Sequence, residues 1–156
     1  MKYIFLAFRF FLSVLQRIGY IISLKKFPPP FAASVAVILQ GNRILLLNRS
    51  DGLGLSLPGG FIDLYENAEK AVIREVFEET GINVTVKQIF CILSGKRKNT
   101  SIGSVDIVYL CEPMSFELNN SIEGKAGWYE IFKLQEKDLA LDYYSIIEKV
   151  KKDFFL

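Results

Sequence analysis

Runs of apolar residues separated by short polar segments predict a chain built largely of β-strands. Residues 31–39 (FAASVAVIL) and 43–48 (RILLLN) are rich in aliphatic and β-branched side chains, and Gln40-Gly41-Asn42 between them is typical of a hairpin turn. Further strands are predicted at residues 82–93, with some bend, and at residues 105–111 and 127–132. The segments 49–57, 95–104 and 112–125 contain glycine or many polar residues, which predicts loops.

Two segments in this part of the chain have the periodicity of helices. One follows Asn67, which is suited to cap it, carries Glu69 in its first turn and ends at Gly81. The other, residues 141–155, is amphipathic. One helix among the strands and one after them predict an α+β fold, an α/β/α sandwich around a mixed β-sheet.

The first 24 residues predict an amphipathic helix. Their polar positions gather into a stripe of roughly 100° on a helical wheel, and the rest of the circumference is apolar. The stripe is formed by Lys2, Arg9, Ser13, Gln16, Arg17 and Tyr20. Arg9 and Arg17 interrupt the apolar run, which disfavours a transmembrane span and a cleaved signal peptide. Two interpretations stay open: a helix lying on a membrane surface, and a helix packed on the domain or on a dimer partner.

Composition and charge divide the chain into three parts. We expect a basic, apolar helix at residues 1–26, a proline-rich linker at 27–30 and a single globular domain at 31–156. Residues 1–30 contain five basic residues and no acidic ones, whereas residues 31–156 contain 14 basic and 17 acidic residues. The domain is therefore not expected to bind nucleic acid, and Lys25 and Lys26 suit the helix to an anionic lipid surface.

Cysteine and histidine usage narrows the chemistry. Cys91 and Cys111 both lie in apolar strand-like runs, so we expect reduced core residues. The chain has no histidine, which excludes histidine-based nucleophilic catalysis and disfavours an ordinary zinc site. Acid–base and metal chemistry must therefore come from carboxylates.

Three glutamates crowd the end of the predicted central helix. Glu75, Glu78 and Glu79 fall within an arc of roughly 100° on one helix face. Like charges at this spacing destabilise a helix by about 0.2–0.5 kcal/mol per pair, and negative charge opposes the dipole at this end. A bound cation is the simplest compensation, and hard oxygen ligands favour Mg²⁺ or Mn²⁺.

The segment from Gly60 to Ile82 resembles the signature of the Nudix hydrolase family, GX5EX7REUXEEXGU, in which U is a bulky aliphatic residue. Gly60, Glu66 and the run Arg74-Glu75-Val76-Phe77-Glu78-Glu79-Thr80-Gly81-Ile82 match every defining position, and Leu57-Pro58-Gly59 precedes them as in the family. Leu55 stands where many relatives carry Trp, so we expect a different packing contact there. The resemblance implies the same α/β/α fold and the hydrolysis of nucleoside diphosphates linked to another moiety, with Mg²⁺ and with Mn²⁺ as a substitute.

The resemblance also implies roles for individual residues. Glu75, Glu78, Glu79 and the Gly59 carbonyl match metal ligands, and Glu75 is our choice of general base, with Glu123 the alternative. We expect Arg74, pairing with Glu78 or Glu66, to orient carboxylates, and Gly60, Glu66 and Gly81 to be structural. Candidate substrate-binding residues are Arg49, Arg97 and Lys98, although each also suits a solvated surface charge; Tyr109 and Trp128 suit either base stacking or the core.

The sequence thus predicts a Mg²⁺-dependent hydrolase that cleaves a diphosphate linkage by water attack on phosphorus. Two alternatives stay open: a non-catalytic nucleotide-binding sensor, and a membrane-surface enzyme acting on a diphosphate-linked lipid precursor. Expected partners are a small nucleotide diphosphate, a membrane touched peripherally through residues 1–26, and a second copy in a homodimer. The expected location is the cytoplasm, including the inner face of the membrane.

Overall fold

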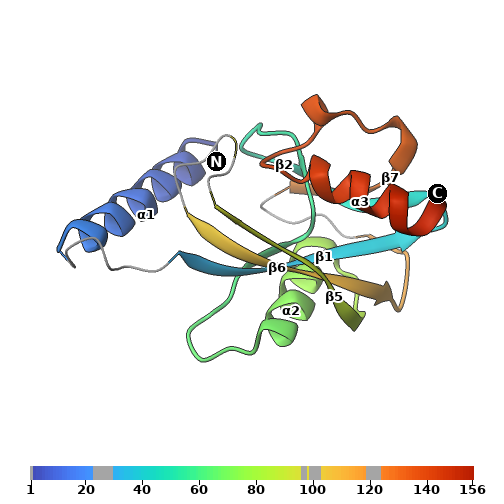
Figure 1. The fold of residues 1–156 in the computed structure, drawn as a ribbon, viewed down its shortest axis with the longest axis horizontal. Helices are drawn as coiled ribbons and strands as arrows, with labels where there is room; N and C mark the ends of the chain where they lie inside the picture. The colour runs from blue at the N-terminus through green and yellow to red at the C-terminus, as the bar shows by residue number, and fades with distance from the viewer. Residues whose placement is uncertain (1, 23–29, 96–97, 99–102, 119–123) are drawn as a thin grey trace.

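The computed structural model describes residues 2–22, 30–95, 98, 103–118 and 124–156 (Figure 1). The regular elements, in chain order, are α1 (Lys2–Ile22), β1 (Phe31–Gln40), β2 (Arg43–Arg49), β3 (Leu55–Ser56), β4 (Gly59–Phe61), α2 (Ala68–Thr80), β5 (Val84–Gly95), β6 (Ser104–Pro113), β7 (Gly124–Glu130), the 3-10 helices η1 (Ile131–Lys133) and η2 (Glu136–Asp138), and α3 (Tyr144–Phe155).

The strands form a mixed seven-stranded sheet in which β1 is central. β1 runs parallel to β6, with Val35 opposite Val108, and antiparallel to β2 and to β4. β5 extends the sheet beyond β6, whereas β3 and β7 both pair with β2. The parallel β1–β6 pair requires a long connection, and that connection contains β4, which pairs with β1, and α2, which covers one face of the sheet.

Alternating residues of β1 serve two separate cores. Val35 and Val37 point to the face covered by α3, whereas Ala36 and Ile38 point to the face covered by α2. All four side chains are almost completely buried. Figure 1 shows α2 and α3 on opposite faces of the sheet, so the predicted α/β/α sandwich is confirmed.

Several predicted element boundaries were wrong. Segment 49–57 is not wholly a loop, because Leu55 and Ser56 pair with β2, and the short strand β4 was not predicted at all. β7 starts at Gly124 rather than residue 127 and gives way to η1 at Ile131. The terminal helix starts at Tyr144, three residues later than expected. The bend expected in the strand after α2 is present as two register shifts in β5.

The predicted N-terminal helix is present as α1, which lies at the side of the sandwich, beyond the layers formed by α2, the sheet and α3 (Figure 1). Gln16 joins it to the domain, because its Nε2 donates to the Gly103 carbonyl (3.0 Å) and its Oε1 accepts from the Gly103 N–H (2.9 Å). Among the residues that the structure describes, no helix has both the length and the apolar character needed to cross a membrane.

Candidate active site

Local chemistry fixes both ends of α2, the helix that carries the three glutamates. The Asn67 side chain accepts hydrogen bonds from the backbone N–H groups of Glu69 (2.8 Å) and Lys70 (3.4 Å). Gly81 adopts a left-handed conformation (φ 75°) and donates its N–H to the Phe77 carbonyl (2.8 Å). These caps satisfy backbone groups that would otherwise be left unpaired, and so determine where the glutamates lie.

Glu79 faces inward from the last turn of α2 and is only 6% exposed. Its Oε2 accepts a hydrogen bond from the Gly59 N–H at 2.8 Å, which joins the helix to β4. A buried carboxylate is costly unless its oxygens are satisfied, and the Gly59 amide meets part of that need. The contact brings together two groups that the sequence analysis assigned to one metal site.

Arg74 lies at the centre of the acidic cluster. Its Nε and Nη2 each donate to Glu66 at 2.9 Å, and its Nη1 donates to both Glu75 (2.8 Å) and Glu78 (3.2 Å). Its Nη2 also reaches the Phe61 carbonyl at 3.3 Å. Hydrogen bonding to Glu66 raises the Arg74 pKa and lowers the Glu66 pKa to about 2. The guanidinium therefore orients three carboxylates against β4 and the loop that follows it.

The backbone of β4 lies very close to its neighbours at two glycines. A Cβ on Gly60 would lie 2.6 Å from the carboxylate of Glu75, and one on Gly59 would lie 2.3 Å from the Ser34 carbonyl oxygen. Gly59 also has a φ of 143°, which disfavours other residues. The absence of side chains here lets the Glu75 carboxylate rest directly against the strand.

The donor set fits a hard divalent cation. Glu75, Glu78 and Glu79 offer only oxygen atoms as ligands. Because Gly60 has no side chain, the strand leaves space beside the Glu75 carboxylate. Within the described part of the chain, no three carboxylate or thiol side chains converge as a ready ligand set. In this arrangement Arg74 engages Glu75 and Glu78, and the Gly59 N–H engages Glu79.

Arg49, a candidate substrate-binding residue, lies near this cluster but is engaged by Asp51, which the sequence analysis missed. Its Nε and Nη2 bond the two carboxylate oxygens of Asp51 at 3.0 and 2.7 Å. Burial lowers the Arg49 pKa, but the hydrogen bonds and charge of Asp51 outweigh this effect, and Glu79 also raises the pKa. The sequence signal that could have indicated this ion pair is the short spacing of Arg49 and Asp51, two residues apart in a glycine-containing turn.

Of the remaining candidates Glu123, Arg97 and Lys98, the structure describes Lys98. Glu123 and Arg97 lie outside the described residues. Lys98 is exposed, pairs with Glu136 and donates its backbone N–H to Asp142 at 3.3 Å, so its described contacts lie with the segment that precedes α3. Those contacts give it no described link to the three glutamates.

Tyr109 and Trp128 belong to the core on the α2 side of the sheet. Tyr109 is 4% exposed, and burial raises the pKa of its hydroxyl. Trp128 is partly buried, donates its ring N–H to the Phe116 carbonyl at 3.4 Å and packs edge-on against the Phe116 ring. Cys91 and Cys111 are both reduced thiols, and burial raises the Cys111 pKa to about 12. We therefore interpret Tyr109, Trp128 and the two cysteines as residues that pack in the fold.

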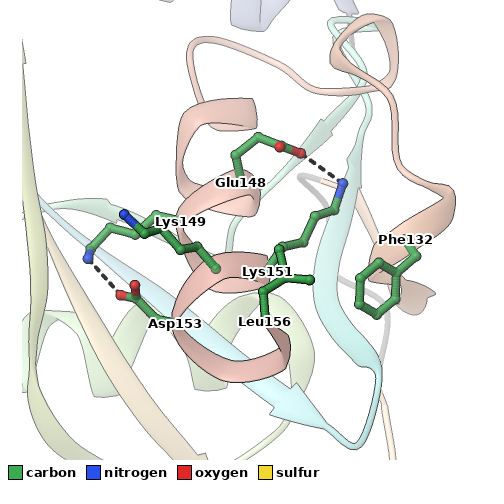
Figure 2. Close-up of a pocket in the computed structure, with 7 residues that line it drawn as sticks. Phe132, Glu148, Lys149, Lys151, Asp153 and Leu156 are labelled. Atoms are coloured by element: carbon green, nitrogen blue, oxygen red, sulfur yellow. Dashed lines mark hydrogen bonds and ion pairs between the residues drawn. The ribbon is translucent and has the colours of Figure 1, made fainter.

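A shallow hollow on the outer surface of α3 is lined mainly by charged residues, four of which form two ion pairs. Lys149 bonds Asp153 at 2.6 Å and Lys151 bonds Glu148 at 2.8 Å, with Phe132 and Leu156 beside them (Figure 2). Neighbouring carboxylates thus pair with two of the three lysines that line the hollow, the third being Lys152. It plays no part in the site described above.

Known proteins resemble this chain in both sequence and structure. Residues 28–150 match the family model described as "NUDIX domain". The chain belongs to the NUDIX family. A "MutT-like protein" of Streptomyces ambofaciens is 41% identical over 113 residues, covering 70% of this chain and 71% of the relative. An "ADP-ribose pyrophosphatase" of Methanocaldococcus jannaschii is 31% identical over 129 residues, covering 80% and 73%.

The Nudix fold is also shared with a solved structure. The crystal structure of a MutT NUDIX hydrolase from Burkholderia pseudomallei superimposes with a TM-score of 0.67 at 27% identity, covering 78% of this chain and 98% of that one. Residues 28–150, which match the family model, contain β4 and α2, with Glu75, Glu78 and Glu79. The chain is therefore a Nudix-type hydrolase of the pyrophosphohydrolase class.

Proposed function

We propose that this Nudix hydrolase uses Mg²⁺ to cleave the diphosphate linkage of a nucleoside diphosphate joined to another moiety. The observation that carries the proposal is the position of Arg74 Nη1, which lies 2.8 Å from a Glu75 oxygen and 3.2 Å from a Glu78 oxygen. One positive group thus contacts both carboxylates. A divalent ion that binds there would replace this contact and leave Arg74 on Glu66.

The chain supplies ligands and a base for this chemistry. Glu75, Glu78, Glu79 and the Gly59 carbonyl are the groups proposed to hold the ion, which neutralises phosphoryl charge and lowers the pKa of bound water. Glu75 is proposed to accept a proton from the attacking water. The water oxygen bonds to phosphorus, the bond from that phosphorus to the bridging oxygen breaks, and the leaving phosphate carries away the bridging oxygen.

Substrate choice rests on groups outside the glutamate cluster. The name of the Methanocaldococcus jannaschii relative makes ADP-ribose the first compound to test. Arg49 is 29% exposed in its side chain and within electrostatic reach of Glu79, so we propose that it exchanges Asp51 for a substrate phosphate. Arg97 and Lys98 stay candidates for the same role.

A substrate panel with isotope-labelled water tests this proposal. The purified chain is incubated with Mg²⁺ and ADP-ribose, other nucleoside diphosphate derivatives or nucleoside triphosphates, and products are separated by ion-exchange chromatography. In H₂¹⁸O, one product phosphate should gain one ¹⁸O, as expected for attack on phosphorus.

Glu78→Gln should lower kcat by about 10²–10⁴-fold. The control, Glu112→Gln, changes an exposed glutamate of β6 that pairs with Lys87 and should retain full activity. Equal turnover by Glu78→Gln would contradict the proposal.

A further inference from the structure

Helix α1 presents a broad apolar surface to solvent. Six large apolar side chains of this helix, from Phe10 onward, are between 47% and 76% exposed. They are Phe10, Phe11, Leu15, Ile18, Ile21 and Ile22. At 100° per residue they occupy an arc of roughly 140° on one side of the helix. Leaving this much apolar surface in water is unfavourable, which points to a binding surface.

The tie to the domain determines which way this surface faces. Gln16 lies roughly 130° around the helix from the centre of the row formed by Phe11, Leu15, Ile18 and Ile22. Both of its side-chain amide atoms bond the backbone of Gly103, whose carbonyl also accepts the N–H of Phe31 at the start of β1 (3.0 Å). The polar side of α1 is therefore held against the domain, and the apolar row faces away from it.

Charge identifies the partner. Residues 1–30 contain five basic residues and no acidic ones, in a chain whose other residues carry more acid than base. Arg17 is exposed and lies roughly 20° around the helix from Phe10, at the border of the apolar arc. An apolar face with a cation at its border, in a basic segment, matches an anionic lipid surface, where apolar side chains enter the acyl region and cations contact headgroups. Pairing with a second copy would instead bring two basic segments together.

We propose that α1 lies along an anionic lipid surface, with Phe11, Leu15, Ile18 and Ile22 buried in the bilayer interface. The Gln16–Gly103 hydrogen bonds then hold the catalytic domain on the opposite, aqueous side of the helix. This proposal is independent of the one made for the glutamates, since it concerns where the enzyme works and not what it cleaves.

Vesicle co-sedimentation of the full chain tests the proposal. Vesicles of phosphatidylcholine with 30% phosphatidylglycerol are compared with vesicles of phosphatidylcholine alone. The wild-type chain should bind the anionic vesicles more tightly, and Arg17→Glu should weaken that binding at least about fivefold. Ile18→Asp should weaken it at least about tenfold. The matched control is Ile92→Asp, which places the same charge on a residue of β5 that is 60% exposed and should bind like the wild-type chain.

Two further readouts distinguish the other occupants of this face. Circular dichroism melting checks that Ile18→Asp and Ile92→Asp are both folded, and light scattering gives the mass without lipid. Equal vesicle binding by Ile18→Asp and the wild-type chain would overturn the proposal. So would a wild-type dimer that ignores vesicles and that Ile18→Asp converts to a monomer, because the apolar row would then join two copies.

Discussion

Two parallel hydrogen bonds of 2.9 Å join the guanidinium of Arg74 to the carboxylate of Glu66. Arg74 uses its remaining nitrogen to reach Glu75 and Glu78, so one side chain joins the loop after β4 to the acidic face of α2. The planar fork of arginine is needed for this arrangement, since lysine would offer a single charged atom. Several consequences of this network can be measured.

Replacing Arg74 by lysine keeps the charge but removes the fork. We expect kcat of the Arg74→Lys variant to fall by about 10–100-fold, because Glu75 and Glu78 lose the group that orients them. Arg43→Lys is the matched control, since Arg43 is exposed on β2 and bonds only Gln40 among its described contacts. Steady-state kinetics of both variants with the best substrate of the panel make the comparison. Equal losses in the two variants would show that the fork has no special role.

Glu66 should make the fold sensitive to acid. Its pKa is about 2 in the folded chain, against an ordinary value of 4.5, because it accepts hydrogen bonds from Arg74 and from the Asp63 N–H. A lowered pKa stabilises the folded state above pH 4.5, and this contribution disappears as the pH falls from about 4.5 to about 2. Urea unfolding across this range should therefore show a steeper loss of stability in the wild-type chain than in Glu66→Gln. Superimposable pH profiles would contradict the assignment.

A side chain at position 60 should displace the Glu75 carboxylate. In Gly60→Ala, a Cβ would lie 2.6 Å from the Glu75 carboxylate, so that carboxylate must move and activity should fall at least about 100-fold. Gly103→Ala is the control, because the nearest atom to its new Cβ is 3.4 Å away, an ordinary contact. Kinetics and melting temperatures of both variants are compared. A fully active Gly60→Ala enzyme would mean that the position of Glu75 matters little.

The two cysteines should differ in reactivity. Burial raises the Cys111 pKa to about 12, whereas Cys91 is partly exposed. At pH 8 the native chain should react with iodoacetamide at Cys91 well before Cys111, and in urea both should react rapidly. Peptide mass spectrometry after timed labelling measures the two rates. Equal labelling of both in the native chain would show that Cys111 is accessible.

Sequence signals predicted features that depend on local chemistry. Asn67 and Gly81 bound α2 as expected, because an amide cap and a left-handed glycine act within one helical turn. The aliphatic and β-branched side chains of residues 31–39 likewise predicted a strand, which is present as β1. The motif from Gly60 to Ile82 indicated the family, which the comparisons established.

Features that depend on distant parts of the chain were not predictable. β4 has three residues and is a strand only because β1 pairs with it. A glycine at position 124 suggests a loop, yet Gly124 begins β7. A Cβ there would lie 2.5 Å from the Asn48 carbonyl oxygen, so the close approach of the two strands requires glycine. The contact of Glu79 with the Gly59 N–H joins residues twenty positions apart, so only the folded chain shows it.

Manganese binding followed by electron paramagnetic resonance tests the central claim most directly. The signal of free Mn²⁺ falls as the ion binds, so titration of the wild-type chain gives its affinity without any substrate. We predict one site whose affinity falls at least about tenfold in Glu78→Gln and in Glu79→Gln, and is unchanged in Glu112→Gln. Equal affinity in all four proteins would show that the glutamates of α2 do not hold the ion and would contradict the account.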